Sequence, residues 1–246
     1  MAATVEHVMG MPILVDVRDD VDLLVLEPLW AWFRWVDATF STYKDDSEIS
    51  RLGRGELELG AADPAVQYVL ARCETLRRET RGYFDVQAAG LLDPSGYVKG
   101  WAVDRGVALL EAAGLRNFAV NAGGDIWLAG GALPDFDWRV GIEHPHLPDS
   151  VAAVVQVRDG AVATSGAYAR GDHVLDPHTG EAPADLVSVT VTGPDLGVAD
   201  AYATAAFAMG ARGPGWTAHL RGRYEALTIL ADGRVLSTAG FPRAAL

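Results

Sequence analysis

Hydrophobic positions in the first third of the chain follow two different spacings. Residues 7–18 combine β-branched side chains with alternation, which predicts a turn followed by a strand. Residues 21–40 and 64–80 instead repeat apolar side chains every three or four positions, which predicts two helices, the second capped by Asp63. The polar stretch between them, residues 40–56, is typical of a loop with short helical turns.

The rest of the chain is richer in strand patterns. A helix is predicted at residues 100–113, where Gly114 ends the apolar repeat, and another at residues 198–210, which contains mostly small residues. A hairpin that turns at Asp232 and Gly233 closes the chain. The other predicted strands are residues 117–125, 126–131, 138–145, 152–160 and 186–193.

Together these elements predict a single domain of the α+β class over residues 1–246. The helices do not alternate one for one with the strands, which argues against a doubly wound α/β fold. No internal repeat, low-complexity stretch or linker divides the sequence. A chain of this length is able to bury a large hydrophobic core.

Composition and charge narrow the classes of function. Half of the residues are hydrophobic and 22% are charged, as in ordinary globular proteins. The 33 acidic residues outnumber the 20 basic ones and give a net charge of −13, which repels phosphate backbones and argues against nucleic-acid binding. The single cysteine, Cys73, excludes an intrachain disulfide and is expected to fill space in a helix.

The N-terminal residues and the longest apolar run bear on location. The first residues lack the basic and apolar regions of a signal peptide. The longest apolar run is interrupted by Glu27, Pro28 and Arg34, which argues against insertion into a membrane. A cytoplasmic location is therefore expected.

Two segments are candidates for contact with an anionic ligand. Residues 121–125 place two adjacent glycines between predicted strands, which leaves N–H groups open to oxygen atoms; a tight hairpin turn explains the same pattern. Lys99 stands just before a predicted helix start, with Asp93 six positions upstream. A lysine there opposes the helix macrodipole, and an anionic ligand would offset this; a solvated lysine is the alternative.

Asp200 and Thr204 are the candidates for contact with a metal ion. They are four residues apart, which places both on one face of a helix that is otherwise mostly alanine. A carboxylate and a hydroxyl suit a hard divalent cation. A structural role also explains the pair, and the residues alone favour it, because aspartate is favourable in the first turn and Thr204 is able to bond back to the carbonyl of Asp200.

The loop at residues 163–183 contains His173, Asp176 and His178 among turn-forming residues. An imidazole in such a loop would accept a proton from a hydroxyl near neutral pH. No partner in the sequence orients His173, and nothing fixes the geometry of a metal site built from the three residues. Tyr43 lies in the polar loop that follows the first helix, where packing in a core explains an aromatic residue less well. It is therefore a candidate for lining a pocket.

Seven segments, in order, resemble the motifs of the FAD:protein FMN transferases, the ApbE family. Each motif is short, and their common order over roughly residues 7 to 210 makes the resemblance specific. The segments are MGM, FSTYKDDSEISRLG, GYFDV, LLDPSGYVKGWAVD, NFAVNAGGDIWLAG, AVATSGAYARGDHVLDPHTG and VADAYATAAFAMG.

This resemblance implies both a fold and a reaction. The fold would be α+β, with mixed sheets flanked by helices and a flavin cleft between two halves. FMN would pass from FAD to a Thr or Ser hydroxyl of an acceptor protein with a flavinylation motif, which forms a phosphoester and releases AMP. Mg²⁺, or alternatively Mn²⁺, would hold and neutralise the pyrophosphate, and a base would lie near the incoming hydroxyl.

The resemblance also assigns roles to individual residues. His173 would be the base, and Lys99 would lie near the phosphates. The metal ligands would be Gly96 through its carbonyl, Asp200 and Thr204. The flavin and its adenylate half would be held by Met9, Tyr43, Asp93, Lys99 and the turn Ala122-Gly123-Gly124.

The sequence departs from the family pattern at two positions and leaves two other activities open. Gly53 stands where the family usually has asparagine, and Ala167 where many members have an acidic residue. One alternative is a metal-dependent FAD pyrophosphatase, in which water replaces the acceptor hydroxyl. The other is a flavin-binding protein without catalysis. Self-modification is not expected, because Tyr168 occupies the position where an acceptor of the Ser-Gly-Ala-Thr type has its hydroxyl residue.

Overall fold

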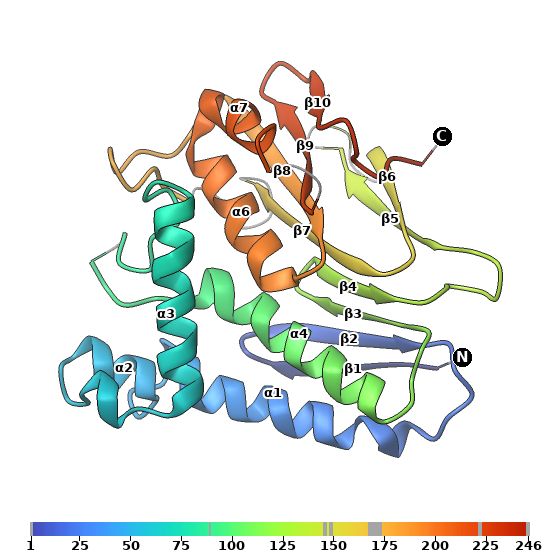
Figure 1. The fold of residues 1–246 in the computed structure, drawn as a ribbon, viewed down its shortest axis with the longest axis horizontal. Coiled ribbons are helices and arrows are strands. Elements are labelled where there is room, and N and C mark those ends of the chain that lie inside the picture. Colours follow the sequence, from blue (N-terminus) through green and yellow to red (C-terminus); the bar gives the residue numbers. More distant parts are fainter. Residues whose placement is uncertain are drawn as a thin grey trace.

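Strands of the chain build one large antiparallel sheet and one small one. A computed structural model describes residues 2–88, 90–144, 147, 150–166, 174–220 and 223–244. Within these residues the large sheet has the order β1-β2-β3-β4-β7-β8-β9-β10, and β5 pairs with β6 in the small sheet (Figure 1). The strands are β1 (Ala2–Val8), β2 (Met11–Val17), β3 (Phe118–Ala122), β4 (Asp125–Ala129), β5 (Trp138–Glu143), β6 (Val151–Val157), β7 (Gly160–Gly166), β8 (Leu186–Gly193), β9 (Glu225–Leu230) and β10 (Val235–Ser237).

Helices gather on one face of the large sheet, which confirms the predicted α+β class. Helix α6 packs against β7 and β8, and α4 packs against β3, β4, α1 and α6 (Figure 1). None of the described helices is long and apolar enough to cross a membrane. The helices are η1 (Leu23–Leu26), α1 (Glu27–Phe40), α2 (Glu48–Gly53), η2 (Leu59–Ala61), α3 (Pro64–Glu79), α4 (Ser95–Ala112), α6 (Leu196–Ala208), η3 (Gly210–Arg212) and α7 (Gly213–Thr217).

Alternation along the strands divides the apolar residues between the two faces of the sheet. On β3, Phe118 and Val120 belong to the large core beneath the helices, whereas Ala119 belongs to a smaller core on the other face. The β5–β6 hairpin covers that smaller core with residues such as Trp138 and Val155. Both faces of the central strands are therefore shielded from water.

Two strands were missed and the start of one helix was predicted too late, each for a local reason. Strand β1 was missed, because it is an edge strand whose alternate residues are exposed. Strand β7 was missed, because it is made of small residues buried almost throughout and shows no alternation. Helix α4 begins at Ser95 rather than at residue 100, because the Asp93 side chain accepts the Ser95 N–H bond at 2.9 Å.

Candidate active site

Helices α4 and α6 cross with their backbones in contact, and this crossing positions the predicted site residues. A Cβ atom on Gly100 would lie 2.5 Å from the main chain of Gly197, and a Cβ atom on Gly197 would lie 2.9 Å from the main-chain nitrogen of Trp101. Only glycine at both positions permits this approach. Gly96 lies one helical turn before Gly100, and Asp200 and Thr204 lie one and two turns after Gly197. The crossing therefore brings the N-terminal halves of the two helices together.

Lys99 lies between two buried carboxylates from different elements. Its Nζ atom is 3.3 Å from Oδ2 of Asp200 on α6 and also forms an ion pair with Oδ2 of Asp125 on β4. The side chain of Lys99 is 17% exposed, whereas those of Asp125 and Asp200 are 2% and 5% exposed. Among the residues that the structure describes, one ammonium thus faces two carboxylates.

The electrostatics of this group keep Lys99 charged. Burial opposes the ammonium form, but the nearby charges of Asp200 and then Asp125 outweigh it and raise the pKa of Lys99 well above its ordinary value. Lys99 therefore remains a cation throughout the physiological pH range. It is suited to holding an anion or a carboxylate in place and unsuited to acting as a base.

Hydrogen bonds from β7 extend the site across the sheet. The main-chain N–H of Thr164 donates to Oδ1 of Asp125 at 3.0 Å, which fixes this carboxylate toward Lys99. The hydroxyls of Ser165 and Thr204 lie 3.1 Å apart and share a hydrogen bond. Strand β7, helix α4 and helix α6 thus meet at one set of oxygen atoms.

The predicted metal ligands fit a hard cation by their chemistry. Asp200 offers a carboxylate and Thr204 a hydroxyl from one face of α6, and Gly96 offers a carbonyl from the first turn of α4. Among the described residues, no group of three or more histidine, cysteine, aspartate or glutamate side chains is suited to hold a metal. A site here would therefore depend on the hydroxyl and the carbonyl as well as on Asp200.

Two tight turns lie at the same end of the large sheet. The β1–β2 turn contains Met9 and Gly10, and the β3–β4 turn contains Gly123 and Gly124; all four residues have positive φ angles. Pairing of β2 with β3 sets the two turns at the same end of the sheet. The predicted hairpin alternative for residues 121–125 is confirmed, and Asp125 follows this turn directly. Met9 is notable because a non-glycine residue at a φ of 57° is strained.

Two other predicted flavin-binding residues, Tyr43 and Asp93, lie on other segments than Lys99, Asp125 and Asp200. Tyr43 is 97% exposed, in the loop between α1 and α2. Asp93 uses its carboxylate at the start of α4, and its own N–H donates to the carbonyl of Val86 at 2.8 Å. Gly53 has ordinary space for a side chain, with Leu92 as the neighbour at 3.6 Å.

His173 and Ala167 lie outside the described residues, so the predicted base is not placed. Described neighbours that follow it are well anchored. The N–H of His178 donates to the buried carboxylate of Asp176 at 2.8 Å, and the His178 ring packs edge-on against Tyr83. His178 itself is exposed.

Sequence reasoning missed two residues of this site. Asp125 was considered only as the end of a glycine turn, yet it is buried and bonded to Lys99. Ser165 was not singled out, yet it is the described hydrogen-bond partner of the Thr204 hydroxyl. A charged residue at the start of a buried strand was the available signal for Asp125, since such residues are seldom buried without a partner.

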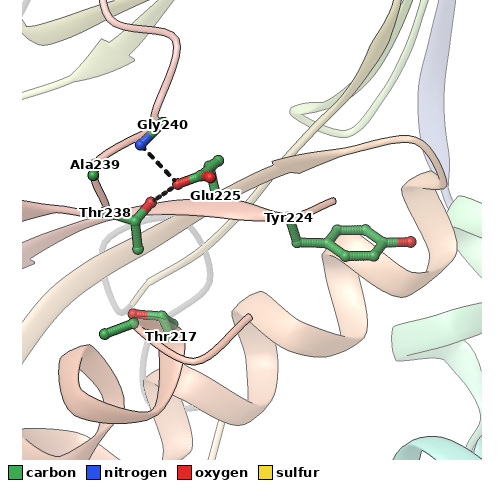
Figure 2. A pocket seen from close by; sticks show the side chains of 7 residues that line it. Thr217, Tyr224, Glu225, Thr238, Ala239 and Gly240 are labelled. Carbon is green, nitrogen blue, oxygen red and sulfur yellow. Dashed lines mark hydrogen bonds between the residues drawn. The ribbon is translucent and has the colours of Figure 1, made fainter. Parts of the chain in front are cut away.

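The surface also has a hollow that contains none of the predicted site residues. It encloses about 250 Å³ beside α7, β9 and the segment after β10, and Figure 2 shows its side chains. Within it, Oε2 of Glu225 accepts hydrogen bonds from the Thr238 hydroxyl and the Gly240 N–H. Glu225 is thus already engaged by its own neighbours.

Comparison with known sequences gives one consistent family. A sequence model of the ApbE family matches residues 9–92 and 87–228. The FAD:protein FMN transferase of Treponema pallidum is 34% identical over 206 residues, which cover 72% of this chain and 57% of that protein. The FAD:protein FMN transferase of Vibrio cholerae is 36% identical over 129 residues, which cover 48% of this chain and 39% of that protein. The matches thus span about half the length of these relatives.

Solved structures share the fold over nearly the whole chain. The flavin transferase ApbE from Vibrio cholerae superposes with a TM-score of 0.85 at 23% identity, covering 98% of this chain and 97% of that one. The ApbE protein from Thermotoga maritima superposes with a TM-score of 0.87 at 21% identity and covers 99% of each chain. At this identity the likeness establishes the fold.

Proposed function

The chain belongs to the ApbE family, and from that premise we propose that it is an FAD:protein FMN transferase. The observation that supports this most directly is the group formed by Lys99, Asp125 and Asp200, beside the hydroxyls of Thr204 and Ser165. A buried ammonium next to paired carboxylate and hydroxyl oxygens suits a pyrophosphate held together with a divalent cation.

The reaction balances as a phosphoryl transfer. The hydroxyl oxygen of a Thr or Ser residue of the acceptor forms a bond to the phosphorus on the FMN side of the FAD pyrophosphate. The bond from that phosphorus to the bridging oxygen breaks, and AMP leaves with the bridging oxygen. The hydroxyl proton passes to a base, for which His173 is the candidate.

This chain's own residues would orient and neutralise the substrate. Asp200, Thr204 and the carbonyl of Gly96 would hold Mg²⁺ or Mn²⁺, which supplies Lewis-acid stabilisation of the pyrophosphate when bound. Lys99 would place its positive charge near the phosphates, and Asp125 would keep Lys99 in position through the ion pair. The turns at Met9 and at residues 122–124 would contact the flavin and the adenylate half.

The proposal extends to partners and location. FAD would be the substrate, and the acceptor would be a protein with a Ser-Gly-Ala-Thr type of motif. We propose no role for nucleic acid, given the net charge of −13. We also propose no membrane insertion, because Glu27, Pro28 and Arg34 interrupt the longest apolar run, and a cytoplasmic location.

In-gel flavin fluorescence tests the proposal. The protein is incubated with FAD, Mg²⁺ and a small acceptor domain that carries a Ser-Gly-Ala-Thr segment, and the products are denatured and separated. A fluorescent acceptor band that is lost with EDTA and in His173→Ala supports the transferase and its base. FMN and AMP without a labelled band would indicate the pyrophosphatase, and intact FAD that stays bound would indicate a flavin carrier.

A further inference from the structure

Helix α6 has an unusual cap at its N-terminus. The residue that precedes the helix, Asp195, makes no side-chain hydrogen bond to it within the described part of the chain. Its carboxylate instead accepts the hydroxyl of Tyr224, with 2.8 Å between the oxygens. The first N–H groups of a helix have no partners within the helix and need an acceptor from elsewhere.

Asp104 of helix α4 supplies that acceptor. Its Oδ1 atom accepts the N–H of Leu196 at 2.8 Å, and its Oδ2 atom accepts the N–H of Gly197 at 3.0 Å. Both oxygens of one carboxylate are therefore used on two consecutive N–H groups of another helix. A negative charge at a helix N-terminus is also favoured by the helix macrodipole.

Asp104 binds α6 at the same place where the glycine contact joins the two helices. It lies one turn after Gly100 on the same face of α4, and its target Gly197 is the residue that Gly100 touches. The glycine contact fixes how closely the helices approach. The two hydrogen bonds fix how far α6 is shifted along its axis relative to α4.

We infer that Asp104 is a positioning residue. By capping α6 from α4, it sets the position of α6 along its axis at which Asp200 pairs with Lys99. Lys99 and Asp104 are on the same helix, and Asp200 is on the helix that Asp104 caps. A one-residue slip of α6 would move Asp200 by about 1.5 Å, enough to break a 3.3 Å ion pair. The functional meaning of this inference rests on the proposed transferase.

The chain itself offers a reporter that needs no catalysis. It contains only two lysines, Lys44 and Lys99. Lys99 pairs with Asp200, whereas Lys44 pairs with Asp37 at 2.6 Å and its side chain is 44% exposed. Lys99 also pairs with Asp125, so amine labelling of Lys99 relative to Lys44, measured by mass spectrometry, reports the loss of Asp200 when it is compared with the labelling in Asp200→Asn.

The experiment compares four forms of the full chain without flavin, metal or acceptor. Asp104→Asn removes one acceptor at the start of α6. Asp200→Asn shows the labelling expected when the ion pair is lost. Tyr224→Phe is the matched control, because it removes a hydrogen bond at the same end of α6 and leaves the two N–H groups of Leu196 and Gly197 capped.

Asp104→Asn is expected to raise the labelling ratio of Lys99 to Lys44 to about the value in Asp200→Asn, because Asp200 no longer lies at Lys99 in either variant. Tyr224→Phe is expected to leave the ratio at the wild-type value even where it lowers the melting temperature equally. Where Asp104→Asn does not fold, Asp104→Ser, which also keeps a single oxygen acceptor, should raise the ratio in the same direction.

A wild-type ratio in Asp104→Asn would overturn the inference, and so would an equal rise in Tyr224→Phe. These outcomes are judged against a raised ratio in Asp200→Asn, because Asp125 also pairs with Lys99. A second readout, binding of Mn²⁺ followed by electron paramagnetic resonance, should weaken in Asp104→Asn and not in Tyr224→Phe. Absence of Mn²⁺ binding in the wild type, with the labelling result intact, would count against the proposed function and leave the positioning role standing.

Discussion

Lys99 and Asp200 form an ion pair between two helices, with 3.3 Å from Nζ to Oδ2. The two residues come from segments far apart in the sequence, and the contact of Gly100 with Gly197 lets their helices approach closely enough. Asp125 joins the pair from strand β4.

Removal of both carboxylates should lower the pKa of Lys99. Burial alone disfavours the ammonium, and Asp200 and Asp125 are what raise the pKa above its ordinary value. In the Asp125→Asn/Asp200→Asn double variant, the pKa of Lys99 should fall below the ordinary value of about 10.4. A pH titration of protein labelled with ¹³C-lysine measures this directly, since only two lysines give signals. An unchanged pKa in the double variant would contradict the ion-pair arrangement.

The glycine contact predicts an asymmetric response to alanine. Gly100→Ala would place a Cβ atom 2.5 Å from the main chain of Gly197, and such overpacking costs about 1–3 kcal/mol or more. Gly215→Ala, in helix α7, meets no atom within 4 Å and should be neutral or stabilising, because alanine is the better helix former. Denaturant unfolding of both variants measures the difference. Equal stability of the two would refute the close crossing.

Loss of the Thr204 hydroxyl should impair function more than stability. Thr204→Val removes one hydrogen bond, to Ser165, at a cost of about 1 kcal/mol in unfolding free energy, and it removes a proposed metal ligand. Thr190→Val is the matched control, because it removes the 2.9 Å bond between the Thr164 and Thr190 hydroxyls of the neighbouring strands β7 and β8 and leaves the Thr204 hydroxyl in place. Flavin transfer should fall roughly tenfold or more in Thr204→Val alone. A similar fall in both variants would point to a general structural effect.

Asp104 should give the stability of the protein a characteristic pH dependence. Burial, with an added contribution from the neighbouring charge of Asp195, raises the pKa of Asp104 to about 6, although the N–H groups of Gly197 and Leu196 oppose the rise. The folded state therefore binds this proton more tightly than the unfolded state does. The contribution is fully present below the ordinary pKa of about 4 and is lost as the pH rises through 6.

Asp104→Asn should accordingly flatten the curve of unfolding free energy against pH between about pH 4 and pH 6, by up to roughly 3 kcal/mol. Urea unfolding at several pH values, with Asp93→Asn as a control whose carboxylate lies at the start of α4, measures the change. An identical slope in Asp104→Asn and the wild type would show that Asp104 does not titrate in this range.

The fold class and the approximate positions of many elements were predictable from local patterns. Strand β8 was predicted at its observed bounds, because its β-branched run is flanked by turn residues. The spacing of Asp200 and Thr204 also indicated a shared helix face, which the structure bears out. These features depend on residues that are neighbours in the sequence.

The partners across the site could not be predicted, because they depend on long-range packing. No local pattern shows that Gly100 touches Gly197, and without this contact Lys99 has no reason to meet Asp200. The role of Asp104 was hidden for the same reason, since it caps a helix that begins more than ninety residues later. In the sequence Asp125 resembles an ordinary turn residue. Only the pairing of β4 with β7 brings its carboxylate to the N–H of Thr164.

The most direct test of the proposed function is the mass of the acceptor. An acceptor domain with a Ser-Gly-Ala-Thr segment is incubated with FAD, Mg²⁺ and either the wild-type chain or Asp200→Asn, and its intact mass and peptide map are recorded. We expect that the wild type adds FMN, in a phosphoester bond, to the threonine of the segment and that Asp200→Asn does not. An unmodified acceptor with the wild type, across acceptors that differ around this segment, would contradict it.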